Sequence, residues 1–450
     1  MLKRIAFVLA LTVLAGALGS AQRGAPPAPT VPSTVERGTL RDGTAFMLAK
    51  PDTWNGTLFV SLDTPGLNAG YVTWLLSQGH AVAGNDRSQI GSLMDRAAAN
   101  LVETVDLFTA KFGAPKRSIV WGVSLGGQAA AVAAYRYPNR FVGAMTHCGG
   151  LMGWPAYLNT KLDVAFALKA LLADSARGGP GDANLPLVRI PETTAPINAA
   201  WTALIENAQK TPEGRARIAL AATLGQAPAW TTRNTPEPAA DDLVARQEAI
   251  YRSVLTYSGE FAALRRRLEV PAGGATSWNT GVDYTALLAQ ADATERRTVE
   301  ALYQQAGLSL SADMQALAKA PRVAADKAAT DFVWNMYPFD GAIQIPLLTM
   351  AITGDPNVWT TIDSGYEARV RGAGKQELLR MTYVRGPGHC GFTDAERVAT
   401  FQTLLERMDT GRWPETSAAA MNSRATASAL GEARFLAFTP AKLYRAAQRP

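Results

Sequence analysis

The sequence is poor in the residues that most often bind metals, since its 450 residues include only two cysteines and three histidines. It contains neither the His-Glu-x-x-His spacing of zinc enzymes nor the glycine-rich loop with lysine that binds phosphate groups. We therefore expect no metal and no other cofactor. The net charge is +6, but the basic residues are scattered and their longest run is 265–267, which predicts a solvated surface and no nucleic-acid partner.

Long apolar runs are also lacking, except at the N-terminus. Two basic residues precede an apolar stretch over 5–18, and small residues at 19–21 fit a cleavage site. The stretch is short for a membrane span and a proline-rich segment follows it, so a signal peptide over 1–21 is favoured over a membrane anchor. We expect an exported protein, periplasmic or extracellular, whose mature chain starts with a polar leader over 22–33 and has no membrane span.

The remaining chain changes its pattern twice. Residues 34–150 show antiparallel strands and then alternating strands and helices, which predicts a mostly parallel sheet with helices on both faces, an α/β fold. Residues 151–343 are helix-like segments separated by breaks, and we interpret them as a helical cap inserted between two strands. The sheet pattern returns over 344–412, and 413–450 is a poorly patterned C-terminal tail.

One motif lies at the junction of a predicted strand and a predicted helix. The apolar strand 117–121 leads into Gly-x-Ser-x-Gly at 122–126, and an alanine-rich helix over 128–137 follows. In a nucleophile elbow the serine occupies a sharp turn, and glycines allow the neighbouring backbone to approach it closely. Ser124 is therefore the candidate nucleophile; the alternative is a small residue in a tight turn.

A serine nucleophile needs a base, and three histidines are available. His389 follows the last predicted strand of the sheet, in a glycine-rich loop before a capped helix, and is the candidate base. His147 ends the strand after the elbow, so we expect it to line the site. His80 starts a predicted strand and is expected to be structural.

The base needs an acid that holds its tautomer and stabilises its charged form. In a fold with this elbow the chain order is serine, acid, histidine, and Ser124, Asp355 and His389 satisfy it. Asp355 directly follows a predicted strand, at the carboxyl edge where open α/β sheets bind ligands. Asp363 and Asp340 are alternative acids, with Asp355 then only forming a turn before proline.

At these residues the chain resembles the α/β-hydrolase superfamily and, more narrowly, exported bacterial α/β hydrolases with a large helical cap. The resemblance implies a serine hydrolase for a small-molecule ester or acyl substrate, most simply a carboxylesterase working through an acyl-enzyme. The alternatives are a peptidase of the prolyl-oligopeptidase type and a weakened hydrolase fold used for binding. The matching segments are 121–127, 147–149, 277–284, 353–356 and 388–393.

The chain departs from the resemblance at the end of the third predicted strand. Such enzymes have His-Gly there and a backbone N–H just beyond it that completes the oxyanion hole, whereas this chain has Asp63-Thr64-Pro65. Pro65 has no N–H to donate. We expect Leu125 and Thr64 to be the oxyanion donors, and Asp63 to line the site with its negative charge.

The two cysteines fall beside the predicted site. Cys148 ends the strand next to the elbow strand, and Cys390 directly follows the candidate base. Both lie at the carboxyl edge of the predicted sheet, so a Cys148–Cys390 disulfide would fix the histidine loop; in the alternative, both are free buried thiols. An exported protein favours the disulfide.

Overall fold

The computed structural model describes residues 30–173, 181, 185–337 and 340–445. The predicted signal peptide and the leader up to residue 29 lie outside the described residues. In the part of the chain that is described, none of the helices combines the length and the apolar character needed to cross a membrane.

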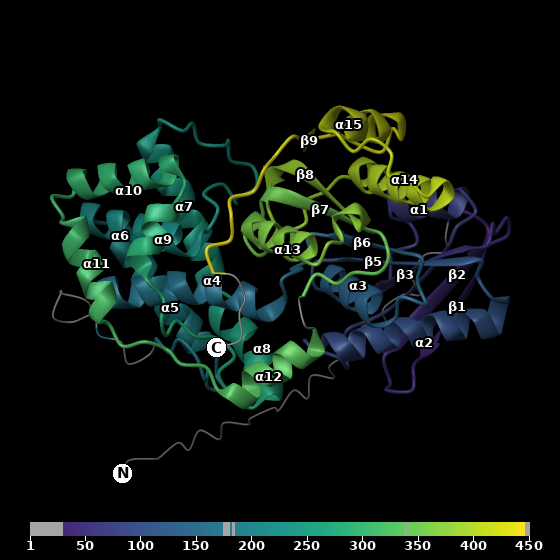
Figure 1. The fold of residues 1–450 in the computed structure, drawn as a ribbon, viewed down its shortest axis with the longest axis horizontal. Helices are drawn as coiled ribbons and strands as arrows, with labels where there is room; N and C mark the ends of the chain where they lie inside the picture. The colour runs from purple at the N-terminus through teal and green to yellow at the C-terminus, as the bar shows by residue number, and fades with distance from the viewer. Residues whose placement is uncertain (1–29, 174–180, 182–184, 338–339, 446–450) are drawn as a thin grey trace, which may run out of the picture.

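A single sheet organises one half of the molecule (Figure 1). Strands β3 to β8 run parallel to one another, while β1, β2 and β9 pair antiparallel at the two edges. The predicted mostly parallel α/β fold is therefore confirmed. Across the described residues the strand order is β1 (Ser33–Thr39), β2 (Ala45–Pro51), β4 (Ala81–Asn85), β3 (Thr57–Leu62), β5 (Arg117–Val123), β6 (Gly143–His147), β7 (Leu347–Gly354), β8 (Leu379–Pro387), β9 (Phe435–Leu436).

Helices bury both faces of this sheet because its central strands are apolar on both sides. On β3, Leu58 and Val60 pack with one set of helices and Phe59 with the other, as the period of two requires. The first set is α2 (Met94–Phe112), α3 (Leu125–Arg136) and α13 (Thr360–Gly372). The second is α1 (Gly70–Ser77) and α14 (Asp394–Thr410).

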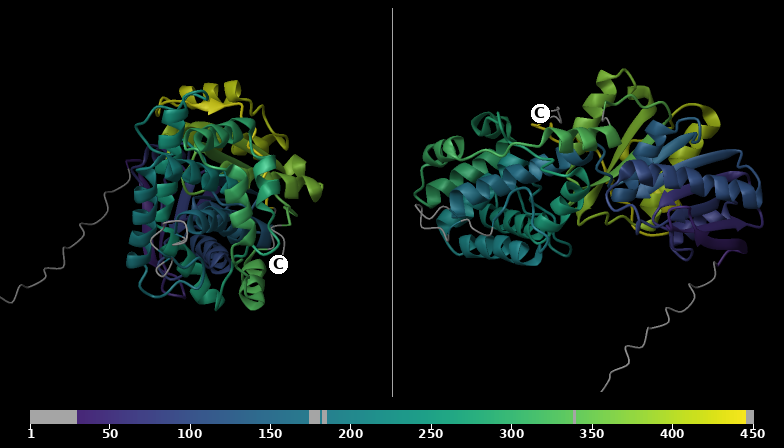
Figure 2. Two further views of the ribbon diagram at one scale, coloured as in Figure 1. Left: turned by 90° about the vertical axis from the view of Figure 1, so that its left-hand side faces the viewer. Right: turned by 90° about the horizontal axis from the view of Figure 1, so that it is seen from below.

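The chain between β6 and β7 forms a second, helical lobe with its own apolar core, which Figures 1 and 2 show beside the sheet. Helix α6 lies inside it, and its alanine-rich sequence lets neighbouring helices pack closely. The lobe contains α4 (Gly153–Leu168), π-helix η1 (Lys169–Ala173), α5 (Ala195–Gln209), α6 (Pro212–Gly225), α7 (Leu243–Ser258), α8 (Phe261–Ala272), α9 (Tyr284–Gln290), α10 (Ala293–Gln305), α11 (Leu310–Lys319) and α12 (Lys327–Met336).

The C-terminal segment, expected only as a poorly patterned tail, belongs to both lobes. Helix α15 (Ala418–Ala427) packs on α14, and β9 pairs with β8 at the edge of the sheet. The chain then crosses to the helical lobe, where the guanidinium of Arg445 binds the buried carboxylate of Asp163 at 2.8 and 2.9 Å. These elements are short and partly polar, which is why periodicity did not predict them.

Candidate active site

The elbow serine has a backbone conformation that few residues other than glycine adopt. Ser124 connects β5 to α3 with φ 56° and ψ −121°. A Cβ atom at Gly122 would overlap the backbone of Gly126, and one at Gly126 would lie 2.9 Å from the carbonyl oxygen of Leu62. The two glycines thus permit a tight turn that exposes the Ser124 side chain at the end of the sheet.

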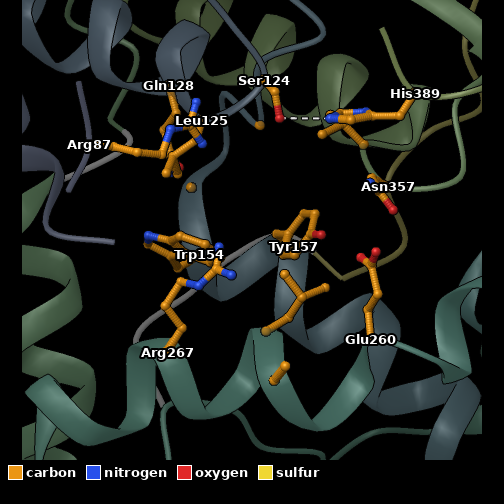
Figure 3. Close-up of a pocket in the computed structure, with 15 residues that line it drawn as sticks. Arg87, Ser124, Leu125, Gln128, Trp154, Tyr157, Glu260, Arg267, Asn357 and His389 are labelled. Carbon is orange, nitrogen blue, oxygen red and sulfur yellow. Dashed lines mark hydrogen bonds between the residues drawn. The ribbon is translucent and has the colours of Figure 1, made fainter. Parts of the chain in front are cut away.

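The structure brings the three predicted triad residues together. Oγ of Ser124 lies 2.7 Å from Nε2 of His389 (Figure 3). The other ring nitrogen, Nδ1, lies 2.9 and 2.8 Å from the two carboxylate oxygens of Asp355. In the tautomer that satisfies both contacts, Ser124 donates to Nε2 and Nδ1–H donates to Asp355.

The Asp355 side chain is buried, with 1% exposure. Backbone N–H groups donate to the carboxylate lone pairs that His389 does not use. The N–H groups of Asn357 and Val358 donate to Oδ1 at 2.7 and 2.9 Å, because the chain turns directly after β7 and folds back on the carboxylate. A buried carboxylate with several hydrogen bonds keeps a fixed orientation. This turn therefore fixes the orientation of His389.

Neither alternative acid is placed to contact the histidine. Asp340 accepts a hydrogen bond from Tyr135 at 2.9 Å, away from His389. Asp363 lies in α13, and its burial, with the nearby charge of Asp355, raises its carboxyl pKa well above the usual value. Asp355 is the acid that the geometry selects.

The expected disulfide between Cys148 and Cys390 is confirmed. It joins the end of β6 to the residue after His389, so the histidine loop is covalently tied to the strand next to the elbow. Because both sulfur atoms are in the disulfide, they are not available as metal ligands beside Asp355 and His389.

His147 was expected to line the site, and the structure places it elsewhere. Its ring is fully buried beneath α14, with Nε2 2.9 Å from Oγ1 of Thr400, and burial lowers the pKa of His147 well below its usual value. The alternation of β6 directs this side chain to the sheet face and not over its edge. His80 is also buried, and desolvation lowers its pKa to about 4, in keeping with the expected structural role.

A cavity of about 460 Å³ opens in front of Ser124 and His389. The sheet lobe contributes one wall, and helices α4 and α8 of the helical lobe contribute the opposite wall (Figure 3). Its side chains include two arginines and one glutamate, which no sequence motif marked. The lining residues are Arg87, Ser124, Leu125, Gln128, Gly150, Gly153, Trp154, Tyr157, Glu260, Ala263, Leu264, Arg267, Asn357, Val358 and His389.

The turn after β3 does not form the part of this wall that the sequence predicted. Leu125 lines the cavity, but Asp63 and Thr64 do not. The N–H of Asp63 donates to the carbonyl of Asn85 at 2.7 Å, and its carboxylate binds the guanidinium of Arg87. Arg87 therefore occupies the wall where Asp63 and Thr64 were expected.

A buried lysine links the helical lobe to the turn after β7 that holds Asp355. Lys161 of α4 is 1% exposed, and its Nζ donates to the carbonyl oxygen of Asn357 at 2.7 Å. Nζ also lies 4.1 and 4.0 Å from the ring centres of Tyr157 and Trp359, a cation–π arrangement. Burial lowers the pKa of Lys161 to about 7. Its sequence context, an apolar helix, gave no sign of this contact.

Comparison with known proteins adds one relative of nearly the same length. The chain is 32% identical over 429 residues to the o-phthalyl amidase of Xanthobacter agilis, covering 90% of this chain and 94% of that protein. No protein-family model matches the chain.

The solved structures that are similar to this chain at low sequence identity include two esterases. Feruloyl esterase B of Aspergillus oryzae has a TM-score of 0.43 and 13% identity, over 87% of this chain and 83% of that one. The rice cell wall degrading esterase LipA of Xanthomonas oryzae has a TM-score of 0.38 and 11% identity, over 84% and 89%.

Proposed function

The chain belongs to the α/β-hydrolase superfamily, in one family with the o-phthalyl amidase of Xanthobacter agilis, and we propose that it is a serine hydrolase whose nucleophile is Ser124. Membership of this family makes it a hydrolase. The observation that carries the proposal is the hydrogen-bonded series from Ser124 through His389 to Asp355 at the wall of the cavity.

In the proposed acylation step, Oγ of Ser124 attacks the substrate carbonyl carbon and its proton moves to Nε2 of His389. The Asp355 carboxylate stabilises the imidazolium that forms. The imidazolium then protonates the leaving amine or alcohol, and the acyl group stays on Ser124. In deacylation the same ring removes a proton from water, which attacks the acyl-enzyme and releases the acid.

The opposite wall gives the proposal a substrate class. Trp154 and Tyr157 present aromatic rings, while Arg267 is exposed and has no ion-pair partner among the described residues. The name of the relative states a phthalyl amide, which is an aromatic acyl group that carries a second carboxylate. We propose that this enzyme cleaves small amides or esters of aromatic carboxylic acids, with Arg267 as the partner of an additional carboxylate.

Two further parts of the proposal concern access and location. Residues 151–343 would act as a cap, because α4 and α8 close the cavity from the side opposite Ser124. Export is supported by the N-terminal sequence pattern and by the disulfide, since disulfides persist in oxidising compartments. Sequencing the N-terminus of the protein from a cell envelope or culture fraction should give a start at residue 22.

Covalent labelling tests the nucleophile. A fluorophosphonate probe should label the wild-type protein and should not label Ser124→Ala. The control is Ser364→Ala, a half-buried serine of α13 that is hydrogen-bonded to the C-terminal segment and does not line the cavity, and it should leave labelling unchanged. Labelling that survives in Ser124→Ala, or absence of labelling in a folded wild-type protein, would support a binding function and contradict the proposal.

A substrate panel tests the bond that is cleaved. It contains p-nitrophenyl benzoate, the phthalyl amide of 4-nitroaniline and a proline-containing peptide p-nitroanilide. We expect the first two to release chromophore in a Ser124-dependent manner. Cleavage of the peptide anilide alone would make the enzyme a peptidase and would contradict the proposed substrate class.

A further inference from the structure

Among the described residues that line the cavity, the backbone N–H of Leu125 is placed to bind the oxyanion that Ser124 would create. Leu125, the residue after the nucleophile, lines the cavity and can donate its N–H. The turn after β3 contributes no residue to the cavity wall: the N–H of Asp63 is bonded to Asn85, Thr64 is not among the lining residues and Pro65 has no N–H. An acyl-transfer site with a single donor would lose much of its transition-state stabilisation.

A charged side chain occupies the wall where the second donor is missing. Arg87 follows β4, whose carboxyl end lies beside that of β3, and it lines the cavity together with Ser124 and Leu125. Figure 3 shows Arg87 on the side of the cavity where Leu125 and Gln128 lie, whereas Arg267 comes from the opposite wall. The guanidinium is thus on the wall that also holds the nucleophile.

Asp63 holds this guanidinium by two of its three nitrogens. Nε donates to Oδ1 at 2.7 Å and one terminal nitrogen, Nη2, donates to Oδ2. The other terminal nitrogen, Nη1, has no hydrogen bond within the described residues, and the fork geometry fixes its direction. Asp63, with φ 72°, therefore directs Arg87 while its own negative charge is neutralised by the pair.

We propose that Arg87 is the second oxyanion-stabilising group of this enzyme, in place of the backbone N–H absent at Pro65. This inference rests on the proposed function. As Oγ of Ser124 bonds to the carbonyl carbon and its proton passes to His389, the π-electron pair of the carbonyl moves onto oxygen. That oxygen accepts hydrogen bonds from the N–H of Leu125 and from Nη1–H of Arg87, and the pair returns when the leaving group departs with the proton from His389.

The proposal is tested with Arg87→Met and Arg87→Lys on the panel substrate that gives the highest Ser124-dependent rate. Arg87→Met should lower kcat by about 10²- to 10³-fold, the usual effect of losing one oxyanion donor, with KM changed less than about threefold. Affinity for phenylboronic acid, which forms a tetrahedral adduct on a serine, should fall in parallel. Arg87→Lys should have a kcat about tenfold higher than that of Arg87→Met, because lysine keeps the positive charge but lacks the planar, forked donors of the guanidinium.

A matched control separates catalysis from the loss of a surface ion pair. Arg140 pairs with Asp106, and neither lines the cavity; their side-chain exposures of 38% and 59% are similar to the 37% and 45% of Arg87 and Asp63. Arg140→Met should keep wild-type kcat. If Arg87→Met does not fold, as judged by thermal unfolding, Asp63→Asn keeps the guanidinium but loosens it, and should lower kcat by about tenfold.

Several outcomes would overturn the inference. Wild-type kcat and boronic acid affinity in Arg87→Met would show that Arg87 is not a catalytic residue. A rise in KM restricted to the anionic phthalyl amide would make it a substrate anchor. A loss found only in Gln128→Leu, from the same wall, would assign the role to the neutral amide. Full activity in Ser124→Ala would instead overturn the proposed function.

Discussion

The two lobes contribute to the cavity in different ways. On the sheet lobe, Ser124, Asp355 and His389 all follow strand ends, and backbone groups, glycines and a disulfide fix their positions. On the helical lobe, Trp154 and Arg267 stand on separate helices and face the cavity only because those helices pack together. In the proposed function, the reacting groups are therefore held by turns at strand ends and by a disulfide, whereas the substrate is recognised by side chains that can change without altering those turns.

We expect the largest loss of activity from a substitution on the sheet lobe. Asp355→Asn should lower kcat by about 10⁴-fold, because an amide no longer holds the reactive tautomer of His389. The matched control is Asp363→Asn, a nearby buried carboxyl with no contact to the histidine, which should stay within about threefold of wild type. Steady-state kinetics and thermal unfolding decide the result, and reversed effects in the two variants would make Asp363 the acid.

Removing the disulfide should lower the stability of the sheet lobe, where it ties the histidine loop to the end of β6. The bond spans a sequence separation of 242 residues, and its loss in Cys148→Ser with Cys390→Ser should lower the free energy of unfolding by about 2–5 kcal/mol. The measurement is urea unfolding of the variant and of the wild type under reducing and non-reducing conditions. Equal stability in all samples would contradict a structural role for the bond.

Lys161 tests the point where the two lobes meet at the turn after β7 that holds Asp355. Its pKa is about 7 when folded and returns to about 10.4 when unfolded, so the unfolded chain binds the extra proton between these values. Stability of the wild type relative to Lys161→Met should therefore rise as pH increases from about 7 towards 10.

Thermal and urea unfolding of both proteins across this pH range provide the measurement. Lys169→Met, which replaces a partly buried lysine just beyond the end of α4, is the control for the loss of a lysine in this region. A difference that is constant with pH would contradict the low pKa of Lys161.

The smallest expected effect belongs to the helical lobe. Arg267→Gln should raise KM for the phthalyl amide of 4-nitroaniline by about tenfold, because the exposed charge pair between Arg267 and the substrate carboxylate is lost. It should leave kcat within about twofold of wild type. KM for uncharged p-nitrophenyl benzoate should not change. A fall in kcat on both substrates would contradict this division of roles, because it would place catalytic function on the helical lobe.

Local sequence patterns were enough for the central strands and helices of the sheet lobe and for the three residues that the structure brings together. The glycine-flanked Ser124 turn, the strand before Asp355 and the loop at His389 each follow from nearby residues, and the parallel sheet then aligns their ends. The same reasoning placed His147, Asp63 and Thr64 at the site, but none of the three lines the cavity. Residues distant in sequence decide on which face of the sheet a side chain at a strand end lies. They also decide the path of the turn that follows the strand.

The α/β fold, the elbow and the cysteines available for a disulfide follow from the amino-acid sequence alone, because they depend on periodicity, glycine and residue type within short segments. The position of Arg87 beside Leu125, held by Asp63, and the contact of Lys161 with the turn after β7 arise only when the chain folds. Both contacts join residues from different elements. No local pattern encodes them, since an ion pair or a buried ammonium is specified by the packing of elements that the chain brings together only on folding.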